Sequence, residues 1–316
     1  MGKQNTNVSN LKTLVVGCTP LARHVVNLLK KESELVGVVN LDPELGLSKS
    51  NYDALTDICD PYWTKDINNE ETEAWITERS PDIIIQCGWS QIFRKNILGI
   101  PAKYCIGIHP SPLPVGRGAA VINWKIIESN GNPVSWGNSL FIMESSTDTG
   151  DIIDFEPFII ETRDDIRTAY QKVNETSLLM LKRVIPKIAS GEEKLTHQDN
   201  SKSSRYYKRK PEDGALDISW SSQKINDYVR GLTHPYPGAF LKTRWGKLTV
   251  WKSSDGPGVY GYKPGIILKV DDSCGVLIST GNETSIWIER ISYDDVECWG
   301  DSWARNKNIT PGVTIS

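Results

Sequence analysis

Short β-branched apolar runs alternate with longer amphipathic stretches through the first two thirds of the chain, and this alternation constrains the fold most strongly. The runs have the composition of buried strands and are bounded by Gly, Pro or Asp. The strand candidates are Leu14 to Gly17, Leu35 to Asn40, Ile83 to Gln86 and Tyr104 to Ile108, the helix candidates Leu21 to Lys31, Glu70 to Arg79 and Ile166 to Ile188. The pattern predicts βαβ units, and hence an α/β fold built on an open parallel sheet.

The texture of the sequence changes after Gly191. Residues 192–204 are polar and typical of a linker. Short strand candidates follow at the close spacing of an all-β unit, namely Gly238 to Thr243, Lys247 to Trp251, Gly265 to Val270, Gly275 to Thr280 and Thr284 to Ile291. We therefore place a domain boundary near residue 204, with an α/β domain and its linker over 1–204 and a small β-barrel over 205–316.

Charge and residue usage exclude several classes of protein. The chain has 36 Lys+Arg against 39 Asp+Glu, a net charge of −3, which gives no global attraction to nucleic acid. Six cysteines without a CxxC pair, and histidines far apart in sequence, indicate neither a zinc site nor a disulfide framework. No segment approaches the roughly 18 apolar residues of a membrane helix, and the first residues contain no apolar signal core. We expect a cytoplasmic protein without a metal or membrane contact.

Two turns carry residues suited to chemistry. Ligands of open α/β sheets bind outside the carboxyl ends of the strands. The first such turn, Gly17 to Pro20, lacks the GxGxxG and Walker patterns, which disfavours a dinucleotide cofactor. The turn from His109 to Gly118 is stiffened by three prolines, and an acidic turn runs from Glu144 to Asp151. Taken alone, His109 could simply end a strand, and the acidic turn could be an ordinary connection.

Together with motifs downstream, these turns resemble the family of formyltransferases that use 10-formyltetrahydrofolate. The sugar N-formyltransferases and the formyltransferase domain of the bifunctional aminoarabinose enzyme are the most similar members. The motifs are His109 to Pro114 with Arg117-Gly118, Ile122 to Ile127, Asp148 to Asp151, Arg209 to Gly214, Asp217 to Trp220 and Pro235 to Phe240. The resemblance covers about residues 81–291. It implies a Rossmann-like catalytic domain followed by an OB-like barrel.

The family pattern implies a catalytic triad of Asn, His and Asp. By motif the His falls on His109 and the Asp on Asp148, but the Asn position is Gly107. In the implied reaction a primary amine attacks the formyl carbon, the imidazole takes its proton, the carboxylate orients or stabilises the imidazole, and the amide donates to the oxyanion. Loss of one such donor costs about 3 to 4 kcal/mol. Three explanations stay open: a backbone N–H or water substitutes, a side chain such as Asn123 or Ser111 substitutes, or the chain has drifted to another chemistry or to binding alone.

The resemblance also implies binding residues. The co-substrate 10-formyltetrahydrofolate would place its pterin along Met143, Glu144, Ser145 and Thr147, between apolar walls at Gln91, Ile92 and Leu113. The expected substrate-binding residues are Ser111, Arg117, Asn123, Trp124, Tyr206, Tyr207, Arg209 and Tyr236. Each of these could equally be a loop residue without a ligand.

The charge of the second domain bears on the identity of the amine. Residues 205–316 contain 15 Lys+Arg and 13 Asp+Glu, a net charge of +2, which is small for a tRNA-binding surface. Two tyrosines lie within the basic run Arg205 to Lys210 and could stack a base beside a diphosphate, or the run could be a solvated linker edge.

From motif details we expect a nucleoside-diphosphate-linked amino sugar of bacterial surface polysaccharide, such as lipopolysaccharide O-antigen. A methionyl-tRNA formyltransferase and a catalytically weak sugar- or folate-binding homologue are the alternatives. Trp299 and Trp303 would suit a dimer contact, a stacking platform or packing against the barrel. A homodimer is therefore compatible with the sequence.

Overall fold

The computed structural model describes residues 10–315, which form two compact units. The first unit contains the chain up to Val121, Ser135–Phe158 and Gln171–Tyr206, and the second contains Ile122–Val134, Ile159–Tyr170 and the chain from Tyr207 onward. Residues 1–9, where we expect no signal core, lie outside the described part. No helix within residues 10–315 is long and apolar enough to span a membrane.

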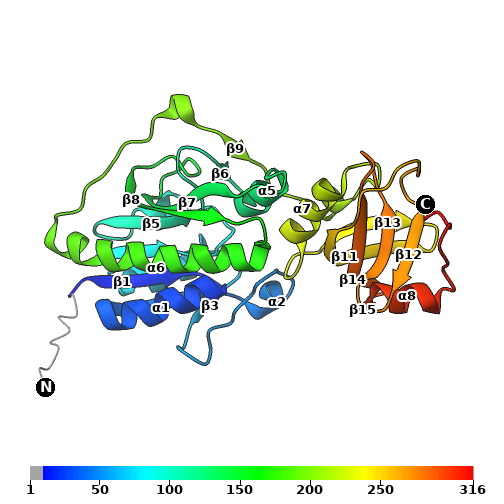
Figure 1. Ribbon diagram of the computed structural model, residues 1–316. Coiled ribbons are helices and arrows are strands. Elements are labelled where there is room, and N and C mark those ends of the chain that lie inside the picture. The colour runs from blue at the N-terminus through cyan, green and yellow to red at the C-terminus, as the bar shows by residue number, and fades with distance from the viewer. Residues whose placement is uncertain (1–9, 316) are drawn as a thin grey trace, which may run out of the picture. The chain divides into compact units, whose positions relative to one another are not determined.

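A seven-stranded sheet forms the centre of the first unit (Figure 1). Its strand order is β3-β2-β1-β4-β5-β7-β8. The strands are β1 Lys12–Val16, β2 Glu34–Leu41, β3 Tyr62–Thr64, β4 Ile83–Gln86, β5 Tyr104–His109, β7 Val134–Ile142 and β8 Ile152–Ile160. The pairs among β1 to β5 are parallel, as the βαβ alternation predicts, and the α/β class is confirmed.

One feature of this sheet corrects the prediction. Strand β7 runs antiparallel to β5, so the sheet is mixed and dominated by parallel pairs rather than wholly parallel. Strands β7 and β8 follow each other in the chain and are neighbours in the sheet, joined by residues 143–151. A parallel β7–β8 pair would need a crossover connection, and residues 143–151 are too few to form one. This end of the sheet therefore departs from the βαβ pattern.

Helices cover both faces of the first sheet. On one face, α1 (Pro20–Glu32) and α6 (Ile166–Ser190) pack Leu29 and Leu181 with strand residues Val15 and Ile106. On the other face, α3 (Glu70–Glu78) and α4 (Lys95–Leu98) pack with a separate apolar cluster that includes Cys105. The short helix α2 spans Pro43–Gly46. The even-numbered and odd-numbered positions of β5 therefore face different helices.

The second unit contains an antiparallel six-stranded sheet of order β10-β11-β14-β13-β12, with β15 paired to β14. Its elements are α5 Val121–Ile127, of which Val121 belongs to the first unit, α7 Ser222–Leu232, β10 Ala239–Thr243, β11 Gly246–Asp255, β12 Ile267–Asp271, β13 Gly275–Ser279, β14 Ser285–Tyr293, β15 Val296–Trp299 and α8 Gly300–Asn306. The predicted strands are confirmed as a separate antiparallel sheet, which α7 and α8 accompany in the same unit, and closure into an OB-like barrel stays a prediction. Trp303 is buried in this core. Trp299 is exposed, and the Arg290 guanidinium lies over its ring, 4.6 Å from the ring centre.

The polar segment after α6 is held against the first unit along its length. Figure 1 shows it, in green to yellow-green, running from α6 to β9 (Arg205–Tyr206). Thr196 forms a bridge with Ile152, and β9 pairs in parallel with β6 (Arg117–Gly118). The short 3₁₀ turn η1 (Asn200–Lys202) interrupts this segment, and a second one, η2 (Pro211–Gly214), follows in the second unit. This segment therefore belongs to the structure around the end of β5.

Candidate active site

His109 is the last residue of β5 and begins the proline-rich turn. Because side chains alternate along a strand, Cys105, Gly107 and His109 face the same side of the sheet, the side covered by α3 and α4. The turn is fixed from β7: Trp136 Nε1 donates to the Pro110 carbonyl at 2.8 Å, and the Ser139 hydroxyl donates to the Ser111 carbonyl at 2.7 Å. The imidazole of His109 is thus buried in a rigid surround.

The hydrogen bonds of His109 determine which ring nitrogen is basic. Its Nε2 lies 2.8 Å from the Gly116 carbonyl oxygen, which can only accept a hydrogen bond. The Nε2 atom must therefore carry the proton in the neutral ring, and Nδ1 holds the free lone pair. This Nδ1 atom lies 3.8 Å from Oδ2 of Asp148. A proton taken up at Nδ1 would thus create an imidazolium directly beside a carboxylate.

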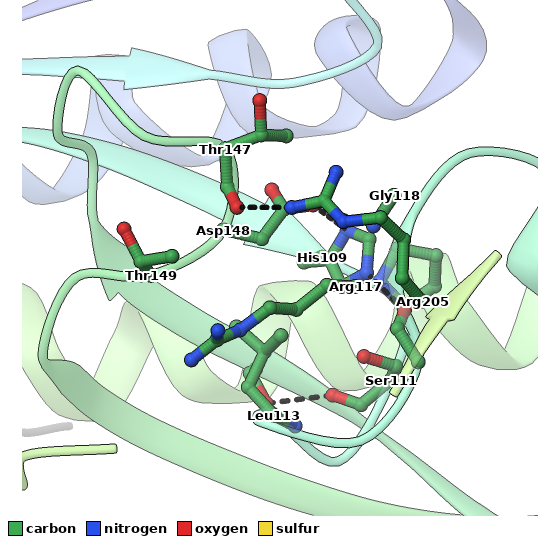
Figure 2. A network of polar contacts seen from close by, with 12 residues as sticks. His109, Ser111, Leu113, Arg117, Gly118, Thr147, Asp148, Thr149 and Arg205 are labelled. Carbon is green, nitrogen blue, oxygen red and sulfur yellow. Dashed lines mark hydrogen bonds and ion pairs between the residues drawn. The ribbon is translucent and has the colours of Figure 1, made fainter. Parts of the chain in front are cut away.

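Asp148 reaches His109 from the connection between β7 and β8. Strand β7 ends beside the first half of β5, with Ile142 paired to Ile106, so the connection must turn back to approach His109. Asp148 adopts the left-handed backbone conformation, with φ of 60°, and its Oδ2 accepts the Gly118 N–H at 2.8 Å. Figure 2 shows His109 and Asp148 side by side. The structure therefore brings together the two side chains that the motifs selected.

Gly107 is enclosed by side chains that the sequence analysis did not single out. It pairs across the sheet with Phe141, and a Cβ atom at 107 would lie 2.5 Å from Cε1 of that ring and 3.1 Å from Cγ of Met143. The Phe141 ring also meets His109 edge to face, with centroids 6.4 Å apart. The volume above Gly107, where a larger side chain would go, is thus filled by an aromatic ring.

The two side chains considered as replacement donors have different surroundings. The Asn123 amide donates to the Gly231 carbonyl at 2.8 Å, inside the second unit. The Ser111 hydroxyl is fully buried and has no hydrogen-bond partner within residues 10–315. The N–H of Gly118 is already taken by Asp148. A backbone or water donor at this site stays a hypothesis.

The turn expected to bind the pterin is exposed and partly free. Residues 144–147 are exposed, and the backbone groups of Glu144 and Ser145 make no hydrogen bond within the described chain. By contrast, the Met143 N–H donates to the Cys105 carbonyl at 2.8 Å, and the Thr147 carbonyl accepts a hydrogen bond from the Arg205 guanidinium. Main-chain N–H and C=O groups without internal partners on an exposed turn are suited to hydrogen-bonding the polar edge of a heterocycle.

The predicted walls of that site differ from one another. The Gln91 amide is tied to the backbone after β3, accepting from the Ile67 N–H and donating to the Lys65 carbonyl. Ile92 is 65% exposed and Leu113 is buried. Ile92 is therefore the one of these three whose apolar side chain is largely open to a ligand.

The predicted substrate residues fall in both units. In the first, Arg117 is buried and bonds to side chains of the 191–204 segment, and the Tyr206 carbonyl accepts from Ala119. In the second, Trp124 Nε1 donates to the Tyr207 carbonyl at 3.0 Å, and the Arg209 guanidinium lies 4.4 Å from the Trp124 ring centre. Tyr236 bonds to Tyr170, and the Tyr207 ring is 75% exposed. Their roles in substrate binding stay predictions.

Two of the buried cysteines of the first unit have thiols with raised pKa values. Burial raises the pKa of the Cys105 thiol to about 12 and that of Cys18 to about 11, so neither is a thiolate nucleophile near neutral pH. No group of His, Cys, Asp and Glu within residues 10–315 has the arrangement of a metal site.

The 191–206 segment supplies residues that the sequence analysis missed. Arg205 donates to the Thr147 carbonyl at 3.2 Å, as Figure 2 shows, and the Ser204 hydroxyl accepts the Gly116 N–H at 2.9 Å. Gln198 bonds to the Asp148 carbonyl. Gln198 and Ser204 lie in a polar stretch of linker composition, where no motif distinguishes them, whereas Arg205 begins the basic run that was considered only for binding a nucleotide.

Comparison with known proteins gives matches along most of the chain. The family model described as "Formyl transferase" matches residues 12–185, and "Formyl transferase, C-terminal domain" matches residues 208–307. Methionyl-tRNA formyltransferase of Bacillus velezensis is 27% identical over 247 residues, 78% of this chain and 76% of that protein. The bifunctional polymyxin resistance protein ArnA of Wigglesworthia glossinidia brevipalpis is 32% identical over 192 residues, 61% of this chain and 29% of its own length.

Two solved structures share the fold at low identity. HypX from Aquifex aeolicus superposes with a TM-score of 0.71 at 18% identity, covering 96% of this chain, which spans about half (49%) of the HypX chain. The N-formyltransferase from Helicobacter canadensis, solved with folinic acid and dTDP-3-aminofucose, has a TM-score of 0.64 at 17% identity and covers 88% of this chain and 98% of its own.

Proposed function

The chain belongs to the formyl transferase family, and from this premise we propose that it transfers a formyl group from 10-formyltetrahydrofolate to the amine of a nucleoside-diphosphate-linked amino sugar. The observation that carries the proposal is the approach of Asp148 to Nδ1 of His109 at the end of β5. A buried imidazole with a free lone pair beside a carboxylate is suited to removing a proton from an attacking amine.

The chemistry of the chain follows from that geometry. 10-Formyltetrahydrofolate supplies the formyl carbon when it is bound, and the free backbone of Glu144 and Ser145 would hold its heterocycle. His109 accepts the amine proton at Nδ1, because Nε2 is engaged with the Gly116 carbonyl. Asp148 then stabilises the imidazolium by charge, and the imidazolium returns its proton to the folate nitrogen as the bond between that nitrogen and the formyl carbon breaks. Rigid partners on both residues keep this pair aligned before the reaction begins.

Several features support a nucleotide-linked sugar as the acceptor. The net charge of +2 over residues 205–316 is low for a surface that must bind tRNA phosphates. The exposed Tyr207 ring, next to Lys208, offers a surface on which a base could stack. ArnA is among the relatives, and the Helicobacter structure contains an amino sugar on dTDP. The relative named methionyl-tRNA formyltransferase supports the alternative acceptor, initiator tRNA.

A transfer assay tests the function directly. Purified protein and 10-formyltetrahydrofolate are incubated with dTDP-, UDP- and GDP-linked amino sugars and, separately, with charged initiator tRNA, and products are read by mass spectrometry. We expect one formyl group on a nucleotide-linked amino sugar. Formylation of the tRNA alone would replace the acceptor that we propose. No transfer to any acceptor, with folate still bound, would overturn the enzymatic proposal in favour of a binding protein.

A further inference from the structure

We propose that Gln198 is a positioning residue, whose side-chain amide holds the Asp148 turn in the conformation that presents its carboxylate to His109. This inference rests on the proposed function for its kinetic consequences. Its structural basis lies entirely within the first unit, in the segment that the sequence suggested was only a linker.

Every polar atom of the Gln198 amide is engaged. The side chain is 2% exposed. Its Nε2 donates to the carbonyl oxygens of Asp148 at 3.0 Å and Gly150 at 2.6 Å. Its Oε1 accepts from Nε and Nη2 of Arg117 at 3.2 and 2.7 Å. An amide has two N–H donors and two acceptor lone pairs, so Gln198 is fully satisfied by these four bonds.

The turn that Gln198 holds is one that needs external support. Asp148 has a φ of 60°, a left-handed conformation that costs a non-glycine residue roughly 1–2 kcal/mol. Gly150 is packed so closely that a Cβ atom there would lie 1.9 Å from the Ile142 carbonyl oxygen. Gln198 anchors the carbonyls of both residues from one side. The Gly118 N–H anchors the Asp148 carboxylate from the other side.

Arg117 connects this support to the second loop of the site. Its guanidinium is buried and bonds to Gln198 and to the Asn200 side-chain oxygen at 2.8 Å. Its backbone N–H bonds to the Ser204 carbonyl, and the next residue, Gly118, supplies the N–H to Asp148. One amide thus ties the Arg117–Gly118 strand to the Asp148 turn. A shift of the turn by about 1 Å would separate the carboxylate from Nδ1, and misplacement on that scale can cost about a hundredfold in rate.

Two substitutions separate the halves of the amide. Gln198→Glu keeps an acceptor for Arg117 but removes both donors to the turn, and Gln198→Met removes both functions at similar length. Gln171→Glu, exposed on α6, introduces the same charge away from the site. We expect both Gln198 variants to lower kcat by about ten- to a hundredfold with KM for the amine nearly unchanged, and the control to behave as wild type.

A second readout does not depend on turnover. The backbone amide NMR signal of Gly118, whose N–H donates to the Asp148 carboxylate, is compared in each substrate-free variant. We expect this signal to shift upfield in Gln198→Glu and Gln198→Met but not in Gln171→Glu, because the hydrogen bond lengthens when the Asp148 turn is released. A wild type without transfer activity would contradict the proposed function, while this signal would still test Gln198. Wild-type kcat and an unchanged Gly118 signal in the folded Gln198→Glu protein would overturn the positioning role.

Discussion

The two units of the molecule use buried polar side chains in opposite ways. In the first, Asp148 and Gln198 are linked to surrounding loops so that one ring nitrogen of His109 stays free beside a carboxylate. In the second, Arg230 donates to Asp227, Ser129 and the carbonyls of Asp164 and Ile126, joining α7 to segments from earlier in the chain.

The difference distinguishes a side-chain pair with a free proton acceptor from an ion pair whose polar groups are bonded to one another. Asp227 is fully buried, and burial raises the pKa of its carboxyl while Arg230 opposes that effect. It accepts bonds from Arg230, Gly131 and Gln223, which satisfy the charge from several sides. Asp148 has fewer partners and faces a histidine that can gain a proton. Asp227 is fully buried beside a permanently charged guanidinium, whereas the Asp148 side chain is 12% exposed and lies beside an imidazole with a free acceptor nitrogen. That free acceptor on the neighbouring group is the feature suited to chemistry.

The largest effect that tests this contrast is expected from Asp148→Asn. An amide cannot neutralise the imidazolium formed when His109 takes the amine proton, so we expect kcat for formyl transfer to fall by about a hundred- to ten-thousandfold. The melting temperature should change little. Asp151→Asn is the matched control, since Asp151 lies in the same turn but pairs with the exposed His197. Equal losses in the two variants, or none in Asp148→Asn, would contradict the role of Asp148.

In the second unit, Asp227→Asn should act on stability rather than on chemistry. The substitution leaves the Arg230 guanidinium buried without its carboxylate, and breaking such a pair costs about 3–5 kcal/mol. Urea unfolding followed by tryptophan fluorescence measures this loss. Glu297→Gln, which breaks an exposed pair with Arg290, should cost about 1 kcal/mol or less. A folded Asp227→Asn protein with a kcat as low as that of Asp148→Asn would contradict the assignment of Asp227 to stability and of Asp148 to chemistry.

A smaller effect concerns Gly107 and the ring that covers it. Gly107→Asn alone forces the new side chain against Phe141, and overpacking of this kind costs about 1–3 kcal/mol. Phe141→Ala removes the ring, so adding Gly107→Asn in that background should not lower stability further. The double variant should have a kcat about tenfold or more above that of Phe141→Ala, since an amide donor is restored. Thermal unfolding and the transfer assay measure both quantities. A single Gly107→Asn variant as stable as wild type would show that Phe141 does not block the position.

The sequence predicted the parallel strands and their helices because these depend on local patterns, since buried strands read as apolar runs. The His109–Asp148 pair was expected from the family resemblance, because each of the two turns taken alone could be an ordinary connection. The antiparallel strand β7 could not be predicted in this way, because strand direction depends on which connection the chain takes. Gln198 and Phe141 were missed for a related reason, since their importance comes from contacts with residues far away in sequence or across the sheet.

The central claim is that His109 is the base of a formyl transfer, and His109→Gln tests it most directly. Single-turnover transfer from 10-formyltetrahydrofolate to the amino sugar is measured for wild type, His109→Gln and the exposed-histidine control His197→Gln. The account predicts rapid transfer by wild type and by the control, and a loss of about a hundredfold or more in His109→Gln. Transfer by His109→Gln at the wild-type rate would contradict it.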